Sequence, residues 1–142
     1  MTRFYAAFVR DEVKDEFTKD VISSYLFVKK KDKGRWEIPI GNFRRNSQLD
    51  RLLGTQEDLG LECRLNMVLT DQNYDGIPKE IDVYVLTCQD GEPRLTKKYE
   101  THKWMTLAEL ATAQDIIINY QKVRTIICMA ESALWQSGVS GS

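Results

Sequence analysis

The sequence predicts one α/β domain in which a mixed β-sheet lies between helices. Its 142 residues suffice for a single hydrophobic core, and neither a repeat nor a linker rich in Pro or Gly divides them. Apolar segments of strand type and two segments of helical periodicity follow one another in the order β-β-β-α-β-β-β-α. We therefore expect residues 1–136 to form the domain and residues 137–142 (SGVSGS) to form a disordered tail.

The first half of the chain contains three extended segments. Residues 4–9 and 21–29 are rich in aromatic and β-branched side chains, which is typical of strands. The polar residues 10–20 between them predict a loop or hairpin connection. Residues 30–34, which end in glycine, predict a turn. Residues 35–40 predict a third, short extended piece.

The first helix is predicted to begin after Ser47, which is a suitable N-cap. Asp50 lies three residues later, in a variant of the capping box. Leucines recur near one face at helical spacing, namely Leu49, Leu52, Leu53 and Leu59. Gly60 is suited to the C′ position that ends a helix. We therefore expect this helix to bury its leucine face in the core.

Three further strands are predicted in the second half, at residues 63–69, 80–87 and 103–106. Within residues 80–87, Ile81, Val83 and Val85 alternate with Asp82, Tyr84 and Leu86. This alternation predicts a half-buried strand.

The last part of the chain is predicted to be helical. Thr106 is a suitable cap for a helical turn at residues 107–110, and a long helix follows over residues 117–136. Its apolar stripe should lie on the sheet and consists of Ile118, Val123, Ile126, Ile127, Ala130 and Leu134.

Charge and cysteine usage argue against several classes of protein. Lys and Arg total 20 and Asp and Glu total 21, so the net charge of -1 gives no overall field for nucleic acid or an anionic membrane. No apolar run approaches about 18 residues, and the N-terminus lacks the pattern of a signal peptide. The cysteines Cys63, Cys88 and Cys128 form neither a disulfide framework nor a zinc pattern. We expect a cytoplasmic protein whose cysteines pack as small hydrophobic side chains.

Residues 34–61 read GRWEIPIGNFRRNSQLDRLLGTQEDLGL. They resemble the Nudix family, whose opening phrase Trp-Glu-aromatic-Pro-Gly-Gly leads into the box GX5EX7REUXEEXGU, where U is apolar. Residues 36–41 follow the opening phrase with Ile40 in place of its first Gly, and residues 57–61 (EDLGL) stand where the box ends. Residues 102–110 (HKWMTLAEL) resemble the Trp-X-X-Leu-X-Glu-Leu phrase that leads into the last Nudix helix. The resemblance implies the Nudix α/β/α sandwich, with a mixed sheet between helices.

The chain departs from the family box at positions that matter for catalysis. Residues 41–61 are two fewer than the box requires. Ser47 stands at the position of the first box Glu, counted from the start of the box. Leu53 and Gly54 stand at the box Arg and at the Glu that follows it, counted from the end. Only the acidic pair near the end of the box remains.

The resemblance also implies a reaction and a cofactor. Nudix enzymes hydrolyse a nucleoside diphosphate linked to another group, and Mg²⁺ or Mn²⁺ is held by helix carboxylates at i, i+3 and i+4. Here that face carries Gly54, Glu57 and Asp58, so one principal ligand is missing. Asp50 is a weak replacement, because it lies about 10 Å from Glu57 along the helix axis. The candidate metal ligands are therefore Glu57, Asp58 and, weakly, Asp50.

Three other charged groups are candidate site residues. Glu100 lies in a loop where Nudix enzymes often hold an acidic general base or third ligand, and with Glu57 and Asp58 it makes the candidate catalytic set. The alternative for Glu100 is a solvated carboxylate near three lysines. Arg44 and Arg45 follow the opening phrase and are candidates for bidentate phosphate binding. The alternative for these arginines is a solvated loop.

Three functions follow, and the fold alone does not separate them. The first is a Nudix-fold protein with weak or no hydrolysis that binds a nucleotide or other phosphorylated ligand, an RNA end or a protein partner. It is favoured because the box has lost charge-stabilising groups. The second is a divergent Mg²⁺-dependent hydrolase of nucleoside diphosphate derivatives, and the third is a scaffold subunit of a larger assembly. No membrane partner is expected; dimers are common in the family, but the sequence does not test the oligomeric state.

Overall fold

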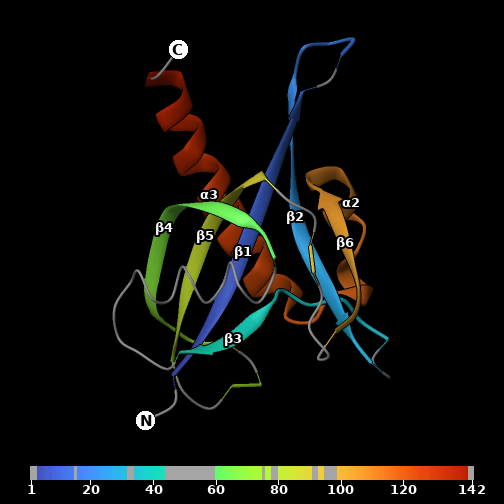
Figure 1. The fold of residues 1–142 in the computed structure, drawn as a ribbon, viewed down its shortest axis with the longest axis vertical. Helices are drawn as coiled ribbons and strands as arrows, with labels where there is room; N and C mark the ends of the chain where they lie inside the picture. Colours follow the sequence, from blue (N-terminus) through green and yellow to red (C-terminus); the bar gives the residue numbers. More distant parts are fainter. Residues whose placement is uncertain are drawn as a thin grey trace.

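The chain forms a mixed β-sheet with helices beside it (Figure 1). The computed structural model describes residues 3–14, 16–31, 34–43, 60–74, 76–77, 80–90, 93–94 and 99–140. These ranges hold a six-stranded sheet, two α-helices and one short 3-10 helix. The predicted α/β class with a mixed sheet is confirmed. The helix predicted after Ser47 lies outside the described residues.

The sheet has the strand order β4-β5-β1-β2-β6, and β3 pairs with β1 off this path. The strands β1 and β5 are parallel, and the other paired strands are antiparallel. The strand bounds are β1 (Arg3–Lys14), β2 (Val21–Lys30), β3 (Ile40–Phe43), β4 (Glu62–Gln72), β5 (Ile81–Asp90) and β6 (Tyr99–Thr106).

The first strand is longer than predicted. It pairs with β5 as far as Arg10, and residues 10–14 pair with residues 21–25 of β2. Residues 10–20 were predicted to be a loop or hairpin connection; residues 10–14 are a strand, so the loop alternative was wrong for them, whereas the hairpin alternative holds. Polar residues are tolerated here because this part of the β1–β2 hairpin projects from the sheet into solvent (Figure 1).

The third extended segment joins β1 and β2 where these strands diverge. Glu37 and Val28 exchange two backbone hydrogen bonds of 2.8 Å, and the amide of Ala7 donates to the carbonyl of Pro39 at 2.9 Å. The strand itself begins only at Ile40 and pairs with the start of β1. Residues 35–40 were predicted to be the strand, so that boundary was placed too early.

The helix α2 (Leu107–Ala111) begins as predicted. Thr106 is its N-cap: the Glu109 amide donates to the Thr106 hydroxyl and the Thr106 amide donates to the Glu109 carboxylate, both at 3.2 Å. This is a complete capping box. The 3-10 helix η1 (Gln114–Ile116) follows.

The helix α3 (Tyr120–Ser140) begins three residues later than predicted. Its start is displaced because Ile117 forms a bridge with Trp36 and Asn119 has a φ of 58°. Residues 137–140, which the sequence assigned to a terminal tail, are helical. None of the helices in the described ranges is long and apolar enough to cross a bilayer.

Two apolar clusters lie against the sheet, one on each face. The first includes Val123, Ile126, Ile127 and Ala130 of α3, which confirms most of the predicted stripe. Ile118 and Leu134 are only half-buried.

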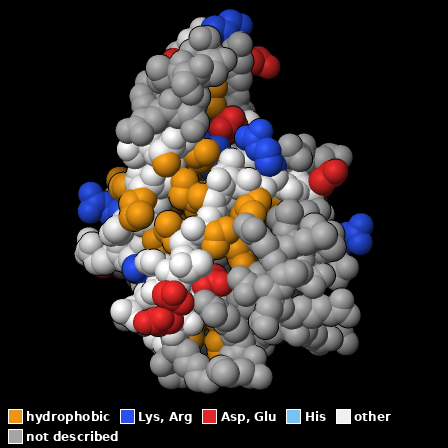
Figure 2. Space-filling model, turned by 90° about the vertical axis from the view of Figure 1, so that its left-hand side faces the viewer, with side chains coloured by type: hydrophobic (Ala, Val, Ile, Leu, Met, Phe, Trp, Pro, Cys, Tyr) orange, Lys and Arg blue, Asp and Glu red, His pale blue; other side chains and the backbone are white. Residues whose placement is uncertain are grey.

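The second cluster is formed by Tyr5, Ala7, Val9, Leu26, Leu61, Cys63, Tyr84 and Leu86. Residues 81–87 of β5 are buried on both faces, because this strand lies between β4 and β1 with a cluster on either side. The prediction that this strand is half-buried was wrong. On the side of the molecule that faces the viewer in Figure 2, apolar side chains reach the surface, in keeping with the partial exposure of residues 65–69 in β4.

Candidate functional site

One of the predicted site residues lies within the described part of the chain. Glu100 is exposed in β6. The remaining candidates lie outside the described residues, namely Arg44, Arg45, Asp50, Glu57 and Asp58. Their proposed roles therefore stay predictions.

Gly41 and Gly60 lie at the two ends of the segment that resembles the Nudix box. A Cβ atom added to Gly41 in β3 would lie 2.5 Å from the hydroxyl oxygen of Tyr5 in β1, so a larger residue would force the Tyr5 ring to shift. Gly60 has a φ of +69°, the left-handed conformation typical of a C′ glycine, and Leu61 beside it is buried. The two glycines are therefore required by the backbone and by close approach, whatever chemistry lies between them.

Glu100 follows Tyr99, whose hydroxyl is hydrogen-bonded to the backbone of Ile40, the residue before Gly41. Tyr99 is buried, and its hydroxyl accepts a hydrogen bond from the Ile40 amide at 3.2 Å and donates to the Ile40 carbonyl at 3.3 Å. The start of β6 is thus attached to β3 at the residue before Gly41. Glu100 itself lies in β6 and not in the predicted loop, and its proposed role stays a prediction.

The segment that matches the opening phrase contains a buried carboxylate that sequence reasoning missed. Glu37 is buried, and its Oε1 has no hydrogen-bond partner within the described ranges; Lys30 Nζ lies 3.5 Å from it. A buried carboxylate oxygen without a hydrogen bond costs stability, so Glu37 is a candidate contact for a bound group. Trp36 packs half-buried against the first cluster, with Lys29 Nζ 4.5 Å from its ring centre.

A pocket lies where residue 35 meets the N-terminal end of α3. The Trp36 amide donates to the Ile116 carbonyl at 2.7 Å, and the Ile118 amide donates to the Trp36 carbonyl at 2.8 Å. These bonds bring Arg35 beside η1 and the first turn of α3. Asn119 forms the corner with its positive φ, a conformation that asparagine tolerates better than most residues.

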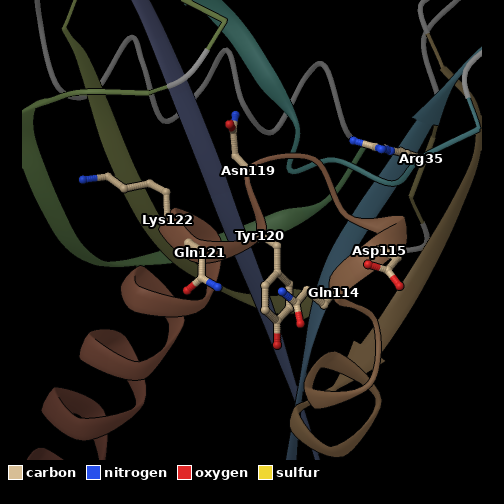
Figure 3. A pocket seen from close by; sticks show the side chains of 7 residues that line it. All are labelled: Arg35, Gln114, Asp115, Asn119, Tyr120, Gln121 and Lys122. Atoms are coloured by element: carbon tan, nitrogen blue, oxygen red, sulfur yellow. The ribbon is translucent and has the colours of Figure 1, made fainter.

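This pocket has a volume of about 620 Å³ and is lined by polar side chains around one aromatic ring. Figure 3 shows the Tyr120 ring near the centre, with Arg35 and Lys122 on opposite sides. Lys122 Nζ donates to Gln72 Oε1 at 3.1 Å, whereas Arg35 has no ion pair among the residues that the structure describes. The lining consists of Arg35, Gln114, Asp115, Asn119, Tyr120, Gln121 and Lys122.

The pocket suits an anionic ligand with an aromatic group. Its volume lies in the range of small-molecule sites, which is about 300–1,000 Å³. Amide side chains both donate and accept hydrogen bonds, a tyrosine ring can stack, and Arg and Lys bind phosphate. Glu100, the predicted site residue that lies within the described ranges, does not line it. The basic run around Arg35 was visible in the sequence, but no spacing rule connects it with the start of α3.

A second polar region lies further along α3, where polar side chains are bonded to one another. Arg10 of β1 is 3% exposed. Its guanidinium donates to Glu131 of α3 (Nε to Oε1, 3.2 Å), to Ser23 Oγ at 2.9 Å and to Glu12 Oε1. The hydroxyl of Tyr25 donates to Glu131 Oε1 at 2.7 Å. We call these five residues the Arg10 network.

The pKa shifts in the Arg10 network follow from burial and pairing. Burial raises the pKa of the Tyr25 hydroxyl, and its hydrogen bond to the Glu131 carboxylate raises it further. Burial alone would lower the pKa of Arg10, but its hydrogen bonds to Glu12 and Glu131 outweigh that effect and raise it. The network therefore fastens α3 to the sheet, with Arg10 charged and the Tyr25 hydroxyl protonated at neutral pH.

Among the described residues, no group of three or more His, Cys, Asp and Glu side chains is arranged to hold a metal ion. The acidic pair of the box-like segment lies outside that part of the chain.

Solved structures of known proteins match the chain over nearly its whole length. The Ap4A hydrolase from C. elegans is 13% identical, with a TM-score of 0.68 over 94% of this chain and 99% of that one. The NUDIX domain of Shewanella oneidensis NrtR, solved with ADP ribose, is 12% identical, with a TM-score of 0.59 over 92% of this chain and 88% of that one. A NUDIX family hydrolase from Clostridium perfringens is 17% identical, with a TM-score of 0.59 over 92% and 94%.

No family model matches the sequence, and no curated protein is significantly similar to it. The structural matches show that the chain has the Nudix fold, as the resemblance of the two phrases implied. At this level of identity they speak for the fold alone, because one fold carries many functions.

Proposed function

We propose that this Nudix-fold protein binds a nucleotide derivative and hydrolyses it weakly or not at all. The observation that carries the proposal is a contrast within one segment. Gly41 and Gly60, which fix the backbone at its two ends, are both retained and structurally required. Between them, Gly54 replaces a carboxylate that holds the metal ion in the family box. The glycines at the two ends of the segment are thus kept, whereas a carboxylate that would hold the metal ion is absent.

The pocket beside α3 supports the binding half of the proposal. Arg35 and Lys122 lie on opposite sides of the Tyr120 ring and suit phosphate groups, and the amide side chains suit the edge of a base (Figure 3). Arg44 and Arg45 are the further phosphate contacts that the sequence suggests. The solved NrtR domain contains ADP ribose, which makes this compound a reasonable first probe.

The absence of a carboxylate at Gly54 supports the second part of the proposal, which is that hydrolysis is weak or absent. An ion that stabilises transition-state charge contributes several kcal/mol, so losing one of its ligands is expected to slow hydrolysis by about 10²–10⁴. Glu57 and Asp58 alone form a weaker site, since Mg²⁺ prefers a full octahedral set of oxygen ligands. A cytoplasmic location is part of this proposal.

Calorimetric titration with ADP-ribose and with Ap4A, each with and without Mg²⁺, tests the proposal. We expect saturable binding in both conditions and product formation far below an ordinary enzymatic rate. Arg35→Ala should weaken binding, whereas Arg124→Ala, an exposed arginine of α3 outside the pocket, is the matched control. Fast, metal-dependent cleavage that Glu57→Gln abolishes would refute the proposal. No binding of either compound would favour an RNA end, a protein partner or a scaffold role instead.

A divergent hydrolase is the second candidate, and one observation favours it. Tyr99, which precedes Glu100, is hydrogen-bonded through its hydroxyl to Ile40, which precedes Gly41. The buried Glu37, four residues before Gly41, supplies a further carboxylate oxygen. Glu100, Glu57, Asp58 and, weakly, Asp50 would then hold Mg²⁺ or Mn²⁺, which neutralises phosphate charge and positions the attacking water.

Metal titration separates the two candidates. The hydrolase requires saturable Mn²⁺ binding in the presence of nucleotide, and Glu100→Gln should reduce both metal affinity and turnover. Glu80→Gln, an exposed carboxylate elsewhere in the chain, is the control. Absence of Mn²⁺ heat at millimolar metal, with and without nucleotide, would eliminate this candidate.

A further inference from the structure

Two cysteines that are distant in the sequence face each other in the sheet. Cys63 of β4 and Cys88 of β5 are direct cross-strand partners in an antiparallel pair. Both side chains pack in the second cluster, so they lie on the same face of the sheet. Cys63 is buried and Cys88 is half-buried, whereas Cys128 on α3 is exposed. The expectation that the cysteines pack as small hydrophobic side chains is confirmed for Cys63 and Cys88 and wrong for Cys128.

Cross-strand geometry brings the pair close to what a disulfide requires. Directly opposed residues of antiparallel strands have Cα atoms about 4.5–5.5 Å apart, inside the disulfide range of about 4.4–6.8 Å. Their Cβ atoms are about 4.5–5.5 Å apart, and a disulfide needs about 3.5–4.5 Å. The strands must therefore approach by about 1 Å, and the irregular pairing between Glu62 and Cys63 leaves the backbone room to adjust.

We propose that Cys63 and Cys88 are a redox-active dithiol that hydrogen peroxide converts into a cross-strand disulfide. The Cys88 thiolate attacks one peroxide oxygen, forming a sulfenic acid and releasing hydroxide, which takes up the proton lost by Cys88. The Cys63 sulfur then attacks the Cys88 sulfur, the S–O bond breaks, and the thiol proton of Cys63 leaves with the hydroxyl group as water. In total two thiols and one peroxide yield one disulfide and two waters, and a thiol reductant reverses the change.

The order of the two steps follows from exposure. Cys88 is the more accessible sulfur, so it meets peroxide first. Burial, with smaller contributions from Cys88 and Glu62, raises the pKa of Cys63 to about 12, so little of this resolving thiol is ionised at neutral pH. Closure should be slow at neutral pH and faster at alkaline pH, because the thiolate is the attacking species.

The disulfide would fix the start of β4, three residues after Gly60. It would also close a loop that contains most of the β4–β5 hairpin, which lowers the entropy of the unfolded chain. The bond thus links the redox state of the cell to the rigidity of the sheet next to the box-like segment. It does not depend on the proposed nucleotide function.

Mass spectrometry of the whole chain tests the inference. The protein is reduced, freed of reductant, exposed to hydrogen peroxide and alkylated before digestion. We expect a peptide linking Cys63 to Cys88, and a rise in Tm on the order of 5–10 °C that a thiol reductant reverses. Cys128→Ser should behave like the parent protein, whereas Cys63→Ser and Cys88→Ser should lose both the linked peptide and the Tm shift.

Two outcomes would overturn the inference. One is that peroxide leaves Cys63 and Cys88 open to alkylation after Cys128 has been oxidised. The other is that the only linked species is an intermolecular dimer through Cys128. The parent protein alone gives this answer, so the inference stays testable even if a serine variant fails to fold.

Discussion

The helix α3 contacts two polar regions, which differ in how far their polar side chains are bonded to one another. In the Arg10 network, halfway along the helix, the buried Arg10 and Tyr25 are bonded to the half-buried Ser23 and Glu131. In the pocket at the start of the helix, Arg35, Tyr120 and Lys122 line an open volume, and Arg35 has no ion pair in the described ranges.

The difference separates structural from binding chemistry. Polar groups that hydrogen-bond to one another stabilise the fold and have few donors or acceptors left for a ligand. Polar groups around an open pocket keep donors and acceptors that a ligand can use. Substitutions in the Arg10 network should therefore change stability and leave ligand affinity nearly intact. Substitutions in the pocket should do the reverse.

The largest expected effect is that of Arg10→Met. The variant keeps much of the side-chain volume but leaves the Glu131 carboxylate and the Tyr25 hydroxyl without their cationic partner. We expect the free energy of unfolding to fall by about 2–4 kcal/mol, because the buried hydrogen bonds of Arg10 are lost while the partly exposed Glu131 carboxylate keeps contact with water. Urea denaturation measures this, with Arg124→Met on the exposed face of α3 as control. A loss below about 1 kcal/mol would show that the network is not a structural unit.

The next effect is that of Tyr25→Phe, which removes the hydrogen bond to Glu131. A bond to a charged acceptor contributes about 1.5–3 kcal/mol, so we expect a loss of that size at pH 7. The raised pKa of Tyr25 gives the difference a pH dependence. The extra stability is fully present below the unfolded-state pKa near 10.0 and is lost as pH rises through the higher folded-state pKa.

Denaturation of the parent protein and of Tyr25→Phe between pH 7 and pH 11 measures how the difference in their stability depends on pH. The gap between the parent protein and Tyr25→Phe should stay constant up to the unfolded-state pKa and narrow above it. A gap that widens at alkaline pH would contradict the assigned hydrogen bond.

In the pocket, Arg35→Ala is expected to raise the Kd for ADP-ribose about tenfold, which corresponds to about 1.4 kcal/mol. The free energy of unfolding should change by less than about 0.5 kcal/mol, because Arg35 is exposed. Calorimetric titration and urea denaturation of the same preparation give both numbers. Equal affinity of the variant and the parent protein would place the ligand elsewhere.

The smallest effect is expected for Lys122→Ala. Lys122 already donates to Gln72, so a ligand phosphate competes with that bond and gains less. We expect Kd to rise about twofold to threefold, close to 0.5 kcal/mol, with a similarly small loss of stability. An effect on affinity larger than that of Arg35→Ala would reverse the ranking of the two cations and identify Lys122 as the main phosphate contact.

Features that depend on neighbouring residues could be predicted from the sequence. The capping box between Thr106 and Glu109 was readable because its spacing is fixed by the first turn of a helix. The positive φ of Gly60 and the buried stripe of α3 were readable for the same kind of reason. Errors arose where pairing partners decided the outcome: residues 10–14 became a strand because β2 pairs with them.

The sequence by itself determined the α/β class and the resemblance to the Nudix fold, because each is a matter of residue type and local spacing; the loss of a carboxylate at Gly54 stays a prediction. Only the tertiary structure decided that Arg35 meets Tyr120, that Arg10 reaches Glu131 and that Cys63 faces Cys88. The physical reason is strand register: residues far apart in the chain become neighbours through backbone hydrogen bonds and packing that no local pattern specifies.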